Sequence, residues 1–278
     1  GLNMLRKTRT RKDNVESSYP VYRVWGIHAR PPCIYKLALG IVPFLLVILA
    51  YSIFSDIARM ENPDDKLRPS LGRIVTRGQQ LVFGSDIRAG EYPLLRDSIA
   101  SMQRMVIGLA FSSSIGLFLG MNIGLFPGLS TVCSPMIRFF SIIPPLSLLA
   151  IFILVFGVGE TAKIMLIIVG TVFVIMRDIQ REVEDVPEED IVTALTLNAS
   201  QLQIVYRVVL PGIIPRLLDV IRLSLIPAWV YLISAESINA DMGLGHRIFV
   251  FMRTSSMVSI IPYVLWITML GYLIDLSL

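Results

Sequence analysis

The chain has 278 residues, of which 54% are hydrophobic and 17% charged. A soluble domain of this size has about a quarter of its residues charged, so the composition excludes an ordinary soluble protein and indicates a membrane protein. The net charge of +4 is not gathered into a basic patch interleaved with aromatic residues, which argues against nucleic acid as a partner and leaves membrane topology as the simpler explanation.

Residues 37–55 (LALGIVPFLLVILAYSIFS) are uncharged and long enough to predict a first transmembrane helix. The preceding segment, residues 1–36, is rich in Lys and Arg, which by the positive-inside rule predicts a cytoplasmic N-terminus. The chain begins GLNM, which makes Met4 a candidate for the native start. The sequence ends at Leu278, close to the membrane, where we would expect a basic tail to follow.

Residues 56–97 mix charges with several Pro and Gly residues, which predicts a periplasmic segment with one short helix over residues 71–83. Residues 98–278 are predicted to form a five-helix core. No residue from 105 to 137 is charged, and Gly120, Gly124, Pro127 and Gly128 interrupt this stretch. We therefore expect a helix, a tight turn and the start of another helix there.

Further apolar stretches complete the predicted fold class, an all-α, polytopic membrane protein with about six transmembrane helices. Residues 139–159 complete the third span, and residues 164–176 form the core of the fourth. The fifth and sixth spans are predicted over residues 213–235 and 258–274. Because successive helices alternate in direction, the polar loop over residues 179–211 is predicted to be cytoplasmic.

This cytoplasmic loop has the signals of two short helices joined by a sharp turn. Pro187 and the acidic residues 188–190 favour a helix start, and the first helix is expected to end at Leu197. Asn198 follows at a position that favours a left-handed backbone. Ser200 and Gln203 have the spacing of a capping box at the start of the second helix.

In the second helix an apolar stripe is predicted on one face. It consists of Leu202, Val205, Tyr206 and Val209. Two interpretations remain open from the residues alone: a folded connector on the membrane surface, or a projection that docks into another protein.

Polar groups and prolines also lie within the predicted spans. Arg216, Asp219 and Arg222 are spaced by three, so we expect them to pair on one helix face, in the bundle interior or at the headgroup level. Two prolines interrupt the third span, and such breaks are tolerated where a helix lines a cavity. If the chain is a transporter, the candidate pathway residues are Ser141, Pro144, Pro145, Ser147, Arg222, Trp229 and Glu236.

Residues 194–215, ALTLNASQLQIVYRVVLPGIIP, resemble the EAA loop of the permease subunits of bacterial binding-protein-dependent ABC importers. SIIPPLSLLAIFILVFGVGETAKI, LLDVIRLSLIPAWVYLISAES and MGLGHRIF are similar to the nitrate, sulfonate, taurine and bicarbonate branch. The resemblance extends over residues 98–275. It implies a type I importer permease fold and a bacterial inner-membrane location.

The resemblance also implies a transmembrane subunit that forms the translocation pathway and couples to a separate ATPase through a cytoplasmic helix. Val192, Thr193 and Asn198 replace the family's glutamate, first alanine and glycine, and Asp190 would substitute for the glutamate. The residues implied in ATPase coupling are Asp190, Thr193, Ala194, Leu195, Thr196, Leu197, Asn198, Ala199 and Ser200.

The implied partners are a dimer of ABC ATPase subunits, a periplasmic or lipid-anchored substrate-binding protein, a second permease subunit in a homodimer, and the lipid bilayer. The chain lacks the phosphate-binding motif G-x-x-x-x-G-K-[ST], so we expect it not to be an enzyme and to bind no cofactor. ATP and Mg would bind to the partner ATPase. The implied substrate is a small anion or organic acid such as nitrate, sulfonate, taurine or bicarbonate.

No metal site is expected either, because the cysteines and histidines lack ligand spacing. The alternative from another class is a secondary transporter or channel that works without an ATPase. It would favour acidic groups for ion coupling or inverted repeats, and neither is evident in the sequence.

Overall fold

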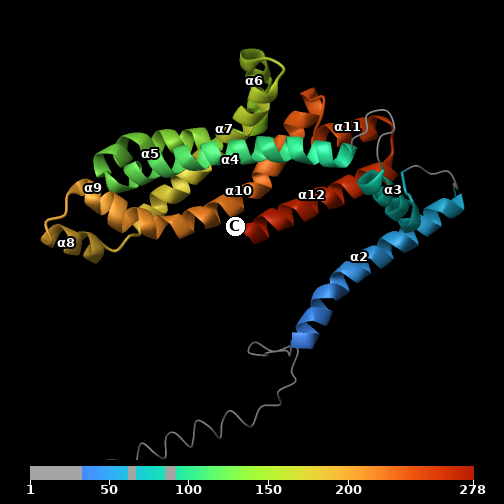
Figure 1. The fold of residues 1–278 in the computed structure, drawn as a ribbon, viewed down its shortest axis with the longest axis horizontal. Helices are drawn as coiled ribbons and strands as arrows, with labels where there is room; N and C mark the ends of the chain where they lie inside the picture. The colour runs from blue at the N-terminus through green and yellow to red at the C-terminus, as the bar shows by residue number, and fades with distance from the viewer. Residues whose placement is uncertain (1–32, 62–66, 85–91) are drawn as a thin grey trace, which may run out of the picture. The chain divides into compact units, whose positions relative to one another are not determined.

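The structure, a computed structural model, describes residues 33–61, 67–84 and 92–278. The chain divides into two compact units, residues 1–65 and residues 66–278 (Figure 1). Residues 1–32, which contain most of the basic N-terminal segment, lie outside the described residues.

The described part of the first unit is one helix, α2 (Cys33–Glu61). Ala38–Met60 within it has the length and hydropathy of a membrane span, in agreement with the predicted first transmembrane helix, and the helix continues beyond residue 55. Its apolar side chains are exposed, for example Phe44 at 72% and Val47 at 70%. Such exposure is expected for a helix whose solvent is lipid.

The second unit is helical throughout its regular elements. These are α3 (Leu71–Phe83), α4 (Pro93–Leu125), α5 (Pro127–Ile142), η1 (Pro145–Leu148), α6 (Leu149–Phe156), α7 (Glu160–Glu184), α8 (Glu188–Thr196), α9 (Gln201–Ile204), η2 (Val205–Val209), α10 (Leu210–Asn239), α11 (Leu244–Arg253) and α12 (Met257–Ser277). The predicted short helix over residues 71–83 is confirmed with the same bounds, because the Ser70 hydroxyl caps its first turn. Helix α4 begins at Pro93, inside the segment predicted to be periplasmic.

The core of the second unit is the packing of α4 against α7, with α10 against α7 on another side. Glycines along α4 lie directly against branched side chains of α7. A Cβ atom built on Gly116 would stand 2.6 Å from Ile175 Cγ2, and one on Gly120 would stand 2.6 Å from the Met176 carbonyl oxygen. Small residues let membrane helices approach closely where no hydrophobic effect drives them together, so the glycines set the spacing of this pair.

Among the described residues, four helices are long and apolar enough to cross a membrane, and there are five if the bent pair α5 and α6 forms one span. Helix α7 is also long, with 25 residues, but it has charges at both ends. These charged residues differ in exposure, since Lys163 is 5% exposed whereas the Glu160 side chain is 57% exposed. The described residues therefore contain four or five candidate spans, against about six predicted.

The third predicted span is a broken helix. α5 ends at Ile142, and the axis turns by 82° before α6. Pro144 and Pro145 lie at the turn, because neither can donate a backbone hydrogen bond to continue the helix. The break was predicted from these prolines, but the sequence did not predict the angle.

The two ends of the second unit differ in character. α8 and α9 lie at the left end in Figure 1, and α11 lies toward the right. We call these the corner end and the α11 end. α4 runs from the α11 end to the corner end, α5 begins at the corner end, and α10 returns to the α11 end (Figure 1).

Candidate functional site

The corner between α8 and α9 is built from two local capping motifs. Asn198 has a φ of 60°, as predicted. The Asn198 N–H donates to the Leu195 carbonyl (2.9 Å), and the Ala199 N–H donates to the Ala194 carbonyl (3.0 Å). This is the pattern of a Schellman motif, in which a left-handed residue closes the end of a helix.

The second helix starts immediately afterwards with the predicted capping box. The Ser200 N–H donates to Gln203 Oε1 (2.8 Å), and the Gln203 N–H donates to Ser200 Oγ (3.3 Å). α9, the π-helical turn η2 and α10 then follow without a gap. The direction of the chain at the corner is therefore fixed by local hydrogen bonds, and the corner continues directly into a membrane helix.

Substitutions of Asn198 test this turn. We expect Asn198→Gly to preserve it, whereas Asn198→Val should destabilise the corner by about 1–2 kcal/mol, because a β-branched residue tolerates a left-handed backbone poorly. The measurement is hydrogen exchange of the Ala199 amide. Exchange that is roughly tenfold faster in the valine variant alone is expected, and equal rates in both variants would contradict the argument.

Apolar side chains project outward from the corner. Val192 is 55% exposed, Leu195 53% and Leu197 78%. The other face of the corner packs inward, since Ala194 and Ala199 contact the cluster around Ile179 and Val209. The corner is thus folded on one side and presents an apolar knob on the other.

The predicted single stripe on the second helix is wrong in one respect. Val205 and Val209 do pack inward, but Leu202 is 70% exposed and Tyr206 is 56% exposed. The π-helical turn shifts the register of the helix after Ile204. Leu202 and Tyr206 therefore add to the exposed surface.

The residues predicted for ATPase coupling are contiguous in space. Asp190 lies in the first turn of α8, where a carboxylate interacts favourably with the helix dipole. The Thr196 hydroxyl donates to the Thr193 carbonyl (2.7 Å). All nine belong to α8, the turn and the N-cap of α9, which are Asp190, Thr193, Ala194, Leu195, Thr196, Leu197, Asn198, Ala199 and Ser200.

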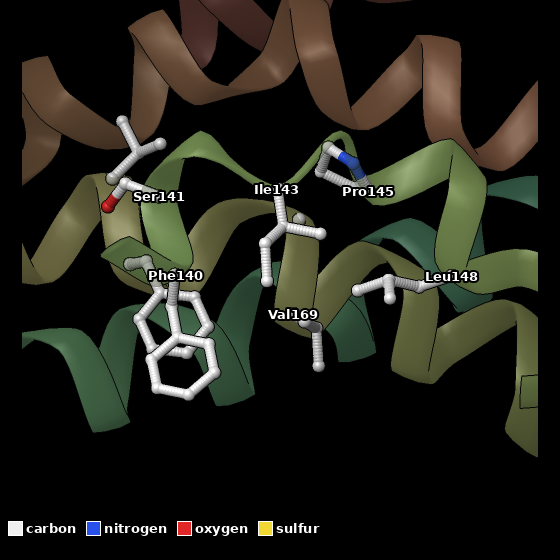
Figure 2. Close-up of a pocket in the computed structure, with 9 residues that line it drawn as sticks. Phe140, Ser141, Ile143, Pro145, Leu148 and Val169 are labelled. Carbon is white, nitrogen blue, oxygen red and sulfur yellow. The ribbon is translucent and has the colours of Figure 1, made fainter. Parts of the chain in front are cut away.

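The predicted pathway residues, in contrast, lie in three separate places. Ser141 and Pro145 line a small cavity of about 40 Å³ at the break between α5 and α6. Figure 2 shows Ile143 between them, with its side chain directed toward Val169 of α7. The cavity is mostly apolar, because the Ser141 hydroxyl donates to the Ile137 carbonyl (2.7 Å).

Pro144 and Ser147 belong to the same break. The Ser147 N–H and hydroxyl both donate to the Pro144 carbonyl, at 3.0 and 2.7 Å. These bonds satisfy a carbonyl that the interrupted helix would otherwise leave free.

Arg222 and Trp229 line a groove of about 940 Å³ between α10 and α12. Arg222 donates from Nε and Nη2 to the two carboxylate oxygens of Asp275, at 2.9 and 3.1 Å. Arg216 contacts Glu182 of α7 at 3.5 Å. The predicted pairing of Arg216, Asp219 and Arg222 along one face is therefore wrong, because each arginine reaches a carboxylate on a neighbouring helix.

Glu236 lies apart from both groups, fully buried at the α11 end. Its carboxylate accepts hydrogen bonds from Ser101 Oγ (2.8 Å), Arg104 Nη1 (2.6 Å) and the Gly245 N–H (2.9 Å). A Cβ on Gly243, whose φ is +133°, would stand 2.6 Å from this carboxylate. The glycines between α10 and α11 therefore let the backbone wrap around Glu236.

Further charged residues extend this network across the helices. Arg104 also donates to Glu160, which accepts from Lys163 Nζ as well (2.9 Å). Beside them, Asp97 is fully buried and accepts from Arg247 Nε at 2.8 Å. We call the following residues the buried polar cradle, with Glu160 as its exposed edge: Asp97, Ser101, Arg104, Lys163, Glu236 and Arg247.

Asp97, Ser101 and Arg104 were not predicted. They lie at i, i+4 and i+7 and so share one face of α4, a signal that is visible in the sequence. Their partners come from α7, α10 and α11, and sequence spacing does not reveal these.

A second groove, of about 620 Å³, lies along α5 and α7. Gln180 Nε2 donates to Ser130 Oγ (3.3 Å), Ser134 Oγ (3.0 Å) and Glu184 Oε1 (2.8 Å). Arg138 lines the same groove and is exposed. This arginine was also absent from the predicted site.

The family of the chain follows from comparison with known proteins. Residues 112–278 match the family model described as "Binding-protein-dependent transport system inner membrane component". An ABC transporter permease protein of Methanocaldococcus jannaschii is 30% identical over 190 residues, which cover 68% of this chain and 71% of that protein.

Two relatives have named substrates. The taurine transport system permease protein of Escherichia coli is 30% identical over 149 residues, and the match spans 54% of each protein. The bicarbonate transport system permease protein of Synechococcus elongatus is 27% identical over 183 residues, and the match spans 66% of each.

The fold is similar to that of a chain of the MetNI methionine ABC transporter in an inward-facing conformation. The TM-score is 0.61 at 22% identity, covering 67% of this chain and 93% of that chain. Because the family model covers most of the chain and the helices follow this arrangement, the protein belongs to the binding-protein-dependent transport system inner membrane components, as a permease subunit with the fold of a type I ABC importer.

Proposed function

We propose that this permease subunit moves a small anion across the bacterial inner membrane and takes its energy from a separate ATPase that docks on the corner between α8 and α9. The observation that supports this most is the exposed knob of Val192, Leu195 and Leu197 on a turn fixed by hydrogen bonds. A folded amphipathic projection of this kind suits a groove in another protein.

The geometry of the corner favours docking over a passive connector. Leu197 is 78% exposed at the end of α8, and burial of such a side chain in a partner groove would contribute about 1.5–3 kcal/mol. α9 continues through η2 into α10, so a displacement of the corner is transmitted to a membrane helix without an intervening loop. ATP and Mg would bind to the ATPase, and two ATPase subunits would serve two permease subunits.

The corner end is the cytoplasmic end in this proposal, and the α11 end faces the periplasm. A periplasmic or lipid-anchored binding protein would deliver substrate at the α11 end, and the N-terminus would be cytoplasmic. A second copy of this chain would complete the pathway. The taurine and bicarbonate permeases among the relatives support a sulfonate, bicarbonate, nitrate or similar anion as substrate.

The test is recovery of an ATP-binding subunit with the chain from its native host in mild detergent. Replacement of residues 194–200 by a Gly/Ser linker should abolish recovery, and Leu197→Asp should lower it on the order of tenfold, because a buried carboxylate is costly. Phe83→Asp is the matched control, since Phe83 is also 78% exposed but belongs to α3, away from the corner.

Recovery of the ATPase with the native chain and with Phe83→Asp, but not with the two corner variants, is the expected pattern. If no ATPase is recovered in several detergents and uptake is insensitive to ATP depletion, the proposal fails and a secondary transporter becomes the better hypothesis.

A further inference from the structure

We propose that the groove along α5 and α7 is an anion-binding site of the translocation pathway, with the Arg138 guanidinium as its positive charge. This proposal rests on the permease function proposed above and names the residues that would recognise its substrate. The ligand class is a small oxyanion, a sulfonate or a carboxylate-like ion such as bicarbonate.

The position of Arg138 is the first argument. It lies in α5, one turn before the break at Ile143, within an apolar membrane segment. In the described part of the chain it has no ion pair and no side-chain hydrogen bond. An ionised residue at membrane depth normally faces water or a paired charge, so an unpaired arginine on a groove indicates that the groove is filled with water.

The hydroxyl groups beside Arg138 are the second argument. Ser130, Ser134 and Arg138 follow one another at four-residue spacing and lie on one face of α5. Gln180 donates one N–H to Glu184 and shares the other between the two hydroxyl oxygens, which lie 3.2 Å apart. One hydroxyl hydrogen links the two serines, which leaves the other free to donate to a ligand.

The groove therefore offers a guanidinium and a hydroxyl donor along one path. A guanidinium donates two parallel hydrogen bonds to an oxyanion. Glu184, the acidic residue of the groove, lies one turn beyond Gln180 toward the corner end, whereas Arg138 lies one turn beyond Ser134 toward the break. The two charges are thus on opposite sides of the serines.

Other cavities of the second unit are less suited to an anion. In the groove between α10 and α12, Arg222 is neutralised by Asp275, and Asp219 adds a further negative charge. The cavity at the break holds only about 40 Å³ and is mostly apolar. In the buried polar cradle Arg104 and Arg247 are each paired with a carboxylate. Among the described arginines of these cavities and clusters, Arg138 is the one without a carboxylate partner, and it can therefore bind an anion.

The experiment uses the full chain in lipid nanodiscs, with Cys33→Ser and Cys133→Ser as background and Thr131→Cys, which lines the same groove, as reporter. A water-soluble methanethiosulfonate reagent labels the reporter, and the labelling rate is measured in the presence of methanesulfonate, bicarbonate or chloride at equal ionic strength. It is also measured with dimethyl sulfone, the neutral isostere of methanesulfonate. This readout needs no ATPase, so its failure is distinct from a failure of the proposed coupling.

Methanesulfonate or bicarbonate is expected to slow labelling by about tenfold or more, because hydrogen bonds between charged groups favour binding of an anion over a neutral ligand by about that factor. Arg138→Gln should remove the protection, Arg138→Lys should keep part of it, and Arg73→Gln on exposed α3 should keep all of it. Which of the two anions protects more distinguishes a sulfonate from a bicarbonate site.

Three results would overturn the proposal. They are equal protection by dimethyl sulfone or chloride, unchanged protection in Arg138→Gln, and a reporter that the aqueous reagent does not label. If Arg138→Gln fails to elute as a monodisperse protein, the comparison between Arg138→Lys and native decides. If methanesulfonate protects the reporter no better than chloride does in both of these folded proteins, the proposal is wrong.

Discussion

Glu236→Gln is expected to destabilise the protein strongly, by about 3–5 kcal/mol, because it removes one charge from a buried pair and leaves Arg104 partly uncompensated. The carboxylate accepts from Ser101, Arg104 and the Gly245 N–H. An amide can accept on only one of its two atoms, so at least one donor loses its partner. Thermal unfolding in detergent, followed by fluorescence and by size-exclusion profile, measures the effect.

Two comparisons make the cause specific. Glu160→Gln should cost much less, because the Glu160 side chain is 57% exposed and water replaces part of its interaction. The pair Glu236→Leu with Arg104→Met should be more stable than Glu236→Gln alone, since replacing both partners of a buried pair by apolar groups is often neutral. A Glu236→Gln protein as stable as native would contradict the structural role given to this carboxylate.

Gly120→Ala is expected to force α4 away from α7 and to cost about 1–3 kcal/mol, as overpacking in a close interface does. The added methyl would stand 2.6 Å from the Met176 carbonyl oxygen, 3.1 Å from Ile179 Cβ and 3.2 Å from Ile179 Cγ2. A backbone carbonyl in a helix cannot rotate aside. The expected result is a lower unfolding temperature and a reduced yield of monodisperse protein.

Gly128→Ala is the matched control. A Cβ at Gly128 meets no atom within 4 Å, and alanine is a better helix former than glycine by about 0.5–1 kcal/mol. This variant should therefore be as stable as native or slightly more stable. If both glycine variants lose stability equally, the close approach of α4 and α7 is not what limits substitution at Gly120.

The elements that the sequence predicted best depend on local chemistry. The helix over residues 71–83, the left-handed Asn198 and the capping box of Ser200 and Gln203 are confirmed, because each signal acts within a few residues. The break at Pro144 and Pro145 was predicted for the same reason. The resemblance to binding-protein-dependent permeases likewise depends on ordered motifs, and the family match confirms it.

What the sequence did not predict depends on contacts between distant segments. The partners of Arg216 and Arg222 lie on α7 and α12, so helical spacing alone favoured the wrong pairs. Glu236 was a pathway candidate, and the structure places it in the buried polar cradle instead of a groove. Arg138 was not singled out, because only the fold brings Gln180 of α7 beside the face of α5 that carries Ser134 and Arg138.

The unbroken helical segment from α9 through η2 to α10 has a mechanical consequence. Gln201 and Glu236 lie on this one segment, 35 residues apart in sequence, which corresponds to a lever about 50 Å long. The N-terminal end of this segment lies at the exposed corner. Its C-terminal end lies inside the cradle, where hydrogen bonds hold it in place. A force applied to the corner is therefore resisted at the other end of the same helical segment, and the π-helical turn with Pro215 and Pro227 provides the places where the segment can flex.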